Sequence, residues 1–107
     1  LGYIPKMGEL STTMLRDSLK AYIDTDIDEA RRICEADDEV DRLQDAVYAD
    51  AFKSMIDDNS TIQDNTYRLW TAHNLERIAD RCTNICERII FIVTGSMSEA
   101  ARDVSKY

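Results

Sequence analysis

The stretch that decides the fold is HNLERIADRCTNICERIIFIVTG, residues 73–95. Apolar side chains recur in it at alternating intervals of three and four, at Leu75, Ile78, Cys82, Ile85, Ile89 and Ile92. This spacing is typical of a helix that packs lengthwise along other helices. The sequence therefore predicts that these residues form a buried seam, and that an aspartate in place of Ile78 would be severely destabilising.

A second row of residues in the same stretch is polar and follows the same spacing, at His73, Glu76, Asp80, Asn84 and Glu87. At about 100° per residue, this row lies roughly opposite the apolar seam. Its oxygen and nitrogen atoms are potential metal ligands. We therefore expect one helix to carry both a packing face and a solvent-facing row with metal-binding capacity.

Two further helices are expected upstream of this stretch. A long one should run from Ile27 to about Asp57, and its apolar seam is Ile33, Ala36, Val40, Leu43, Val47, Ala51 and Met55. A first helix is expected over residues 6–23, preceded by an extended lead-in because the residue before Pro5 disfavours helical geometry. The last twelve residues, 96–107, are expected to add one short helix.

Capping signals fix the ends of the long helices. Asp26 followed by Glu29, and Ser60 followed by Gln63, both have the spacing of a capping box, and Gly95 suits the position after a helix end. The third helix should therefore run from about residue 61 to 94. Long helices joined by short turns lie antiparallel, so the predicted fold is an all-α, antiparallel three-helix bundle.

Composition limits the class of protein. The 107 residues carry a net charge of −8, which argues against general nucleic-acid binding. No run of about 18 apolar residues is long enough to span a membrane, and no signal peptide is visible. Because the chain begins at Leu1, we expect one helical domain over residues 1–107 that is a piece of a longer, cytoplasmic protein. Its three cysteines, Cys34, Cys82 and Cys86, are expected to be reduced core residues.

Two pairs of acidic residues are the strongest candidates for a site. Asp37 and Asp41 are one helical turn apart, as are Glu76 and Asp80. If the turn lies near Asn59, antiparallel pairing brings the two pairs to similar heights. A bound cation would offset the repulsion among four carboxylates, although acidic residues on an exposed face are more often simply solvated. These four residues are the predicted metal ligands, with His73 and Asn84 as additional candidates.

The same residues carry a resemblance to a known family. The runs LERIAD (75–80), TNICE (83–87) and FIVTG (91–95), together with two copies of an acidic-x-x-x-Asp motif, resemble the PhoU family of phosphate-signalling proteins. The resemblance implies iron or zinc bound at the bundle surface by these motifs. The family usually has two three-helix repeats, and this chain is similar to the second, C-terminal one. Arg81 departs from the pattern, because the family commonly has histidine after this aspartate.

The function that the resemblance implies is a regulatory adaptor rather than an enzyme. It would couple a phosphate ABC transporter to a sensor histidine kinase and restrain phosphate-starvation signalling. The partner-binding surface is expected at Glu76, Asp80 and Glu87, and a homo-oligomer is left open. Two alternatives remain: a cytoplasmic regulatory domain of a larger phosphate transporter, and a carboxylate-bridged metal enzyme. Tyr67 and Trp70 are expected to pack in the core near the turn.

Overall fold

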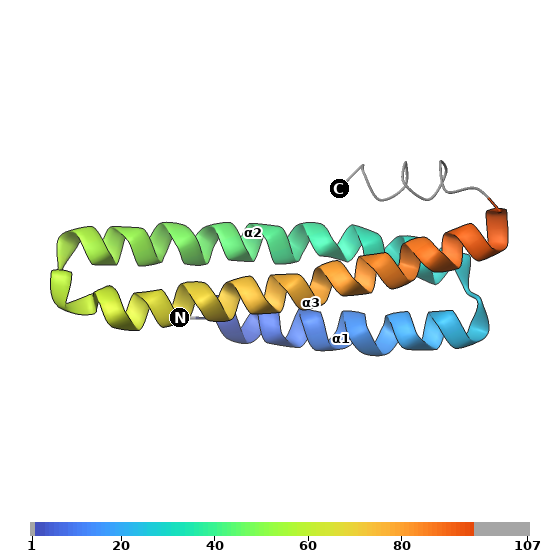
Figure 1. Cartoon of the computed structure of the whole chain (residues 1–107), viewed down its shortest axis with the longest axis horizontal. Helices are drawn as coiled ribbons and strands as arrows, with labels where there is room; N and C mark the ends of the chain where they lie inside the picture. The colour runs from blue at the N-terminus through green and yellow to red at the C-terminus, as the bar shows by residue number, and fades with distance from the viewer. Residues whose placement is uncertain (1, 96–107) are drawn as a thin grey trace.

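The computed structural model describes residues 2–95 and has three α-helices in this range: α1 (Tyr3–Asp24), α2 (Ile27–Asp57) and α3 (Ile62–Thr94). A 3-10 turn, η1 (Asn59–Thr61), joins α2 to α3. The three helices lie side by side along the length of the molecule, with α1 and α3 running in the direction opposite to α2 (Figure 1). The predicted all-α antiparallel three-helix bundle is therefore confirmed. The helix expected over 96–107 lies outside the described residues.

Helix α1 begins three residues earlier than predicted, with Pro5 inside its first turn. The Lys6 amide donates to the carbonyl oxygen of Gly2 at 3.1 Å, which closes the first helical turn. Proline is tolerated there because the first amides of a helix have no partner within the helix. The predicted extended lead-in is therefore wrong.

The junction between α1 and α2 follows the predicted signals. Thr25 adopts a left-handed conformation with φ of 52°, and its amide donates back to carbonyls at the end of α1. Asp26 then caps α2, because its Oδ1 accepts from the Glu29 amide at 3.1 Å. The Glu29 carboxylate contacts Arg32.

The turn between α2 and α3 is capped differently from the prediction. Asp58, rather than Ser60, accepts the capping bonds, from the Ser60 amide at 3.0 Å and the Ser60 hydroxyl at 2.7 Å. Thr61, the residue before α3, makes no side-chain cap. At the far end of α3, Gly95 has φ of 70°, and its amide donates to the Phe91 carbonyl oxygen at 2.7 Å, as expected of a helix-ending glycine.

The core runs between all three helices, and α3 follows the predicted seam only in part: Cys82 and Ile89 are buried, Leu75 and Ile85 are partly buried, and Ile78 and Ile92 are exposed. The buried residues of α3 are Asn65, Ala72, Ala79, Cys82, Thr83, Cys86, Ile89 and Ile90. Ile78 is 39% exposed and Ile92 is 52% exposed. In the middle of α3 the buried face therefore includes the small residues Ala72 and Ala79, whereas nearer its end it includes Ile89 and Ile90.

The other two helices agree better with the sequence. On α2, the seam residues Ile33, Val40, Leu43, Val47 and Ala51 are buried as predicted. On α1, the buried residues Met7, Met14 and Ala21 are accompanied by two serines, and Ser11 donates its hydroxyl hydrogen to the Leu75 carbonyl oxygen at 3.1 Å. This bond fixes α1 directly against α3.

The cysteines, the aromatic pair near the turn and the hydrophobicity of the helices complete the description of the fold. All three cysteines are buried and free, as expected of core residues. Tyr67 and Trp70 contact each other edge to face near the turn, but Trp70 is 65% exposed, so the prediction that they pack in the core is wrong. No helix within residues 2–95 is long and apolar enough to cross a bilayer.

Candidate functional site

The structure brings the two acidic motifs together across the α2–α3 contact. Asp37 and Asp41 come from the middle of α2, and Glu76 and Asp80 come from the middle of α3. Burial, followed by the charges of Asp41 and Asp80, raises the pKa of Asp37, so Asp80 on α3 lies within electrostatic reach of the motif on α2. The turn between α2 and α3 therefore brings them level, as the counting from Asn59 predicted.

Asp37 is the most enclosed member of this group, which we call the acidic cluster: Asp37, Asp41, Glu76 and Asp80. Its side chain is half buried, and its Oδ1 atom is buried without a hydrogen-bond partner among residues 2–95. Burial, followed by the negative charges of Asp41, Asp80 and Asp38, raises its pKa from 3.8 to about 6. An orphaned carboxylate oxygen of this kind is suited to accept a proton or a cation.

The pKa of Glu76, on the opposite helix, is also raised. Burial raises its pKa first, and a side-chain hydrogen bond with Asp80 and the nearby acidic charges raise it further, to about 7. The pKa of Asp41 is also raised, by burial and then by Asp80. The cluster is thus a set of like charges that repel one another near neutral pH.

The predicted position of the acidic row relative to the core needs correction. Glu76 was expected nearly opposite the buried face of α3, but it is partly buried, and of the four only Asp80 is exposed. The reason is the shift of the core toward Ala72 and Ala79, which flank Glu76 along the helix. The cluster is therefore a shallow site at the edge of the core.

The chemistry of the cluster suits a hard cation, because it offers carboxylate oxygens, one of them buried and unpartnered. In the conformation described for residues 2–95, however, no three His, Cys, Asp or Glu side chains are arranged so that they could hold a metal ion. Binding would require these side chains to change rotamer. The metal assignment stays a prediction.

The remaining predicted site residues lie on α3 outside the acidic cluster. His73 and Asn84 are exposed, and neither makes a hydrogen bond or ion pair with the residues that the structure describes. Glu87 is partly buried, two turns beyond Asp80. Arg81, which stands where the family commonly has histidine, is exposed beside a depression that it shares with Asn74, Arg77 and Ile78.

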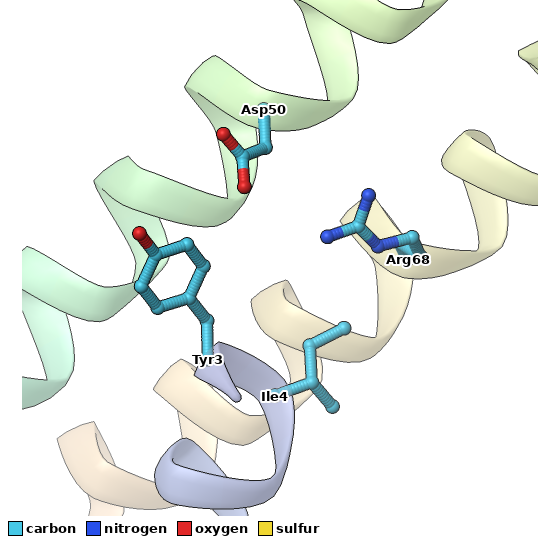
Figure 2. Close-up of a pocket in the computed structure, with 4 residues that line it drawn as sticks. All are labelled: Tyr3, Ile4, Asp50 and Arg68. Carbon is cyan, nitrogen blue, oxygen red and sulfur yellow. The ribbon is translucent and has the colours of Figure 1, made fainter. Parts of the chain in front are cut away.

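A polar hollow near the start of α1 was missed by the sequence analysis. It has a volume of about 400 Å³ and is lined by Tyr3, Ile4, Asp50 and Arg68. Figure 2 shows the Asp50 carboxylate and the Arg68 guanidinium facing this space from α2 and α3. Arg68 donates to the Asn65 Oδ1 atom at 3.0 Å. The hollow depends on where α1 begins, which the sequence did not predict correctly, and it lies away from the acidic cluster toward the turn.

The three thiols form a third group inside the core. Hydrogen bonding to the neighbouring thiol of Cys34, followed by burial, raises the pKa of Cys86. Burial also raises the pKa of Cys82. Because the thiolate is the reactive form, these cysteines are suited to packing rather than to chemistry.

Comparison with known proteins identifies the family. The model of the PhoU domain matches residues 4–89. A PhoU homolog of Clostridium acetobutylicum, named a phosphate-specific transport system accessory protein, is 38% identical over 89 residues, which are 83% of this chain and 41% of the relative.

Two other relatives bear the name phosphate-specific transport system accessory protein PhoU. That of Serratia marcescens is 37% identical over 86% of this chain and 38% of its own length. That of Escherichia coli K12 is 38% identical over the same shares. No solved structure matches the chain. The chain spans about two fifths of the length of these relatives. The match to the family model covers most of the chain, and the chain therefore belongs to the PhoU domain family.

Proposed function

We propose that this chain is part of a regulatory adaptor of phosphate uptake and phosphate-starvation signalling, and that it is not an enzyme. The relatives are named accessory proteins of a phosphate-specific transport system. As a proposal for this chain, its partners are a phosphate ABC transporter and a sensor histidine kinase in the cytoplasm. The match of residues 4–89 to the PhoU domain is the observation that carries the proposal.

The acidic cluster is proposed to bind a metal ion, with iron or zinc as the first candidates. Asp37, Asp41, Glu76 and Asp80 would supply the oxygen ligands, and the cation would offset their repulsion. The unpartnered Oδ1 of Asp37 supports this role. When bound, the ion would supply positive charge and open coordination positions at the surface, where a partner's carboxylate or a phosphate could bind.

The partner-binding surface is proposed to follow Glu76, Asp80 and Glu87 along α3. A negatively charged surface speeds encounter with a basic partner and becomes less effective as salt increases. None of the four cluster residues is fully buried or enclosed at the bundle axis. This position supports a contact surface over an enclosed carboxylate-bridged enzyme site.

Metal binding is tested by elemental analysis of protein purified without chelator, followed by calorimetric titration with Fe²⁺ and Zn²⁺. The wild type should bind, and Asp37→Asn combined with Glu76→Gln should weaken binding at least tenfold. Asp64→Asn, at the start of α3, is the matched control and should bind as the wild type does. Equal binding by all three proteins would remove the cluster as the metal site.

Partner binding is tested separately by titrating the cytoplasmic domain of a cognate sensor kinase, and the ATPase subunit of the transporter, with wild type and Glu76→Ala/Asp80→Ala. The double variant should stay folded by circular dichroism and bind more weakly, with a smaller dependence on salt. Unchanged affinity in the folded variant would exclude this surface. A metal-binding protein with unchanged partner affinity would separate the two parts of the proposal.

A further inference from the structure

Helix α1 contributes two serines to the core, and both contact α3. Ser11 is 1% exposed and Ser18 is 0% exposed. The Ser11 hydroxyl donates to the Leu75 carbonyl oxygen at 3.1 Å, so this bond joins α1 to the backbone of α3. A buried hydroxyl is costly to leave without a partner, and the bond therefore favours one placement of α1 against α3.

Ser18 contacts α3 further along the bundle. Its hydroxyl donates to the Leu15 carbonyl oxygen of its own helix at 3.0 Å. The hydroxyl also lies beside the thiol of Cys82, because burial raises the pKa of Cys82 and hydrogen bonding to Ser18 lowers it in part. Cys82 is 0% exposed, so this second contact also lies inside the bundle.

The two contacts have the same spacing along both helices. Ser18 follows Ser11 by seven residues, and Cys82 follows Leu75 by seven. Helices α1 and α3 run in the same direction (Figure 1), so both contacts belong to one register of α1 against α3. They are about 10 Å apart at ~1.5 Å per residue. Two contacts at this distance fix the position of α1 along α3 and the side that α3 turns toward it.

The segment of α3 between these contacts contains its acidic motif. Glu76 directly follows Leu75, and Asp80 precedes Cys82 by two residues. The charge of Asp37, on α2, contributes to the raised pKa of Cys82, so the second contact borders the acidic cluster from inside the core. Helix α1 therefore holds α3 at both ends of this motif.

The charges of the acidic cluster act against its own geometry. Its carboxylates repel one another, and two of them lie on each of α2 and α3. Helix α1 is also tied to α2, because Arg32 forms an ion pair with Asp17 at 3.2 Å, and Asp17 directly precedes Ser18. Helix α1 thus connects the two helices that carry the cluster and opposes their separation.

We propose that Ser11 and Ser18 are positioning residues for the acidic cluster, holding α3 so that Glu76 stays partly buried beside the carboxylates of α2. Neither serine touches a bound ion. Their effect is preorganisation, because ligands that are already held close together lose less freedom when a cation binds. The functional value of this inference rests on the proposed metal site, whereas the positioning itself is a property of the chain without metal.

The positioning is tested first without metal, by amide hydrogen exchange of wild type and Ser11→Ala/Ser18→Ala, with urea added to equalise global stability. Exchange should become at least about fivefold faster in residues 76–82 of the double variant, with a smaller change in the rest of α3. Ile89→Val, which removes one buried methyl group from α3 outside this segment, is the matched control and should leave residues 76–82 unchanged. Faster exchange spread evenly along α3, or no change in residues 76–82, would overturn the proposal.

Calorimetric titration with Zn²⁺ then tests the consequence for the cluster. Ser11→Ala/Ser18→Ala should bind Zn²⁺ at least about fivefold more weakly than the wild type, although all four carboxylates remain. Ile89→Val should bind as the wild type does. Equal affinity of the double variant and the wild type would overturn the proposal. If the wild type binds no Zn²⁺, the proposed metal site fails instead, and hydrogen exchange alone decides the positioning.

A single substitution keeps the test decisive if the double variant does not fold by circular dichroism. Ser11→Ala removes only the bond from α1 to the Leu75 carbonyl oxygen, which keeps its bond within α3. Exchange should then be faster around Glu76 than around Cys82, and Zn²⁺ should bind more weakly than to the wild type. Wild-type exchange around Glu76 in the folded Ser11→Ala variant would overturn the proposal.

Discussion

The two long sides of α3 differ in a way that hydrophobicity alone does not reveal. Toward α2, the helix carries Glu76 and Asp80, and Glu76 is partly buried beside other acidic residues. Away from α2, it carries Ile78 and Ile92, which are exposed. An acidic side chain thus lies nearer the core than two isoleucines on the same helix. The position of a side chain in this bundle depends on how closely the helices approach, and small residues decide that distance.

The largest difference between the two sides of α3 is expected when the same charge is placed at two adjacent positions of the helix. Ala79 is 0% exposed and Ile78 is 39% exposed. Ala79→Asp buries an unpaired carboxylate and should lower the free energy of unfolding by more than about 4 kcal/mol, enough to unfold many small domains. Ile78→Asp should lower it by only about 1 kcal/mol, contrary to the expectation from sequence.

Urea unfolding followed by circular dichroism at 222 nm measures both variants. Both substitutions introduce the same residue into the middle of the same helix, and the difference in helix propensity between alanine and isoleucine is under about 1 kcal/mol, smaller than the expected contrast. If Ile78→Asp unfolded the chain while Ala79→Asp did not, the core of α3 would follow the isoleucine row after all.

A gentler version of the comparison removes apolar volume without adding charge. Ile89 is buried and Ile92, three residues on, is 52% exposed. Ile89→Ala should cost about 2–5 kcal/mol, because it removes buried methylene groups and leaves a cavity, whereas Ile92→Ala should cost less than about 1 kcal/mol. Midpoints of thermal unfolding would check the order. Equal losses of stability in the two variants would mean that Ile92 is covered in solution.

The acidic side of α3 should make stability depend on pH. The folded pKa of Asp37 is raised from 3.8 to about 6, so the stability it contributes is fully present below about pH 4 and is lost as pH rises through 6. Asp37→Asn removes this loss. The variant should therefore gain stability relative to the wild type between pH 4 and pH 7, and keep that gain at pH 8.

The measurement is the urea midpoint of wild type and Asp37→Asn at pH 5 and pH 8, without added metal. Asp64→Asn is the matched control and should follow the wild type at both values. The folded pKa of Glu76 is raised from 4.5 to about 7, so Glu76 also loses its stabilising contribution as pH rises, over a slightly higher pH range than Asp37. A wild type that becomes more stable from pH 5 to pH 8 would contradict the mutual repulsion in the cluster.

Much of the fold was predictable from the sequence because local signals coincide with it. The bounds of α2 match the prediction at both ends, since Asp26 provides a cap and the aspartates at 57 and 58 interrupt the apolar pattern. The sequence also predicted that the two acidic motifs lie at similar heights, because a short turn between long helices leaves little freedom in the relative height of their residues. These features depend on spacing along the chain, which a sequence states directly.

The pattern of large apolar residues predicted the buried row of α3 only in part, at Cys82 and Ile89. Ala72, Ala79 and Thr83 are small or polar, yet they are buried. The hollow beside Arg68 was missed for a related reason, since it depends on where α1 begins relative to the other two helices. Both features depend on three-dimensional packing that periodicity within one helix does not record.

The smallest effect expected on the acidic side is also the most specific, and it tests whether the two motifs act on each other. Glu76 is perturbed by Asp80, Asp41 and Asp37, whereas Asp38 perturbs Asp37 and Asp41. Removing the charge at position 41 should therefore lower the pKa of Glu76, by roughly half a pH unit for charges several ångströms apart at the surface. Carbon-13 NMR titration of the side-chain carboxyl groups would measure this shift in the pKa of Glu76.

Asp41→Asn should lower the pKa of Glu76 and Asp37 together, while Asp38→Asn should lower the pKa of Asp37 and leave the pKa of Glu76 unchanged. If Asp38→Asn moved Glu76 as far as Asp41→Asn does, the raised pKa would reflect the overall negative charge of the chain rather than two motifs facing each other.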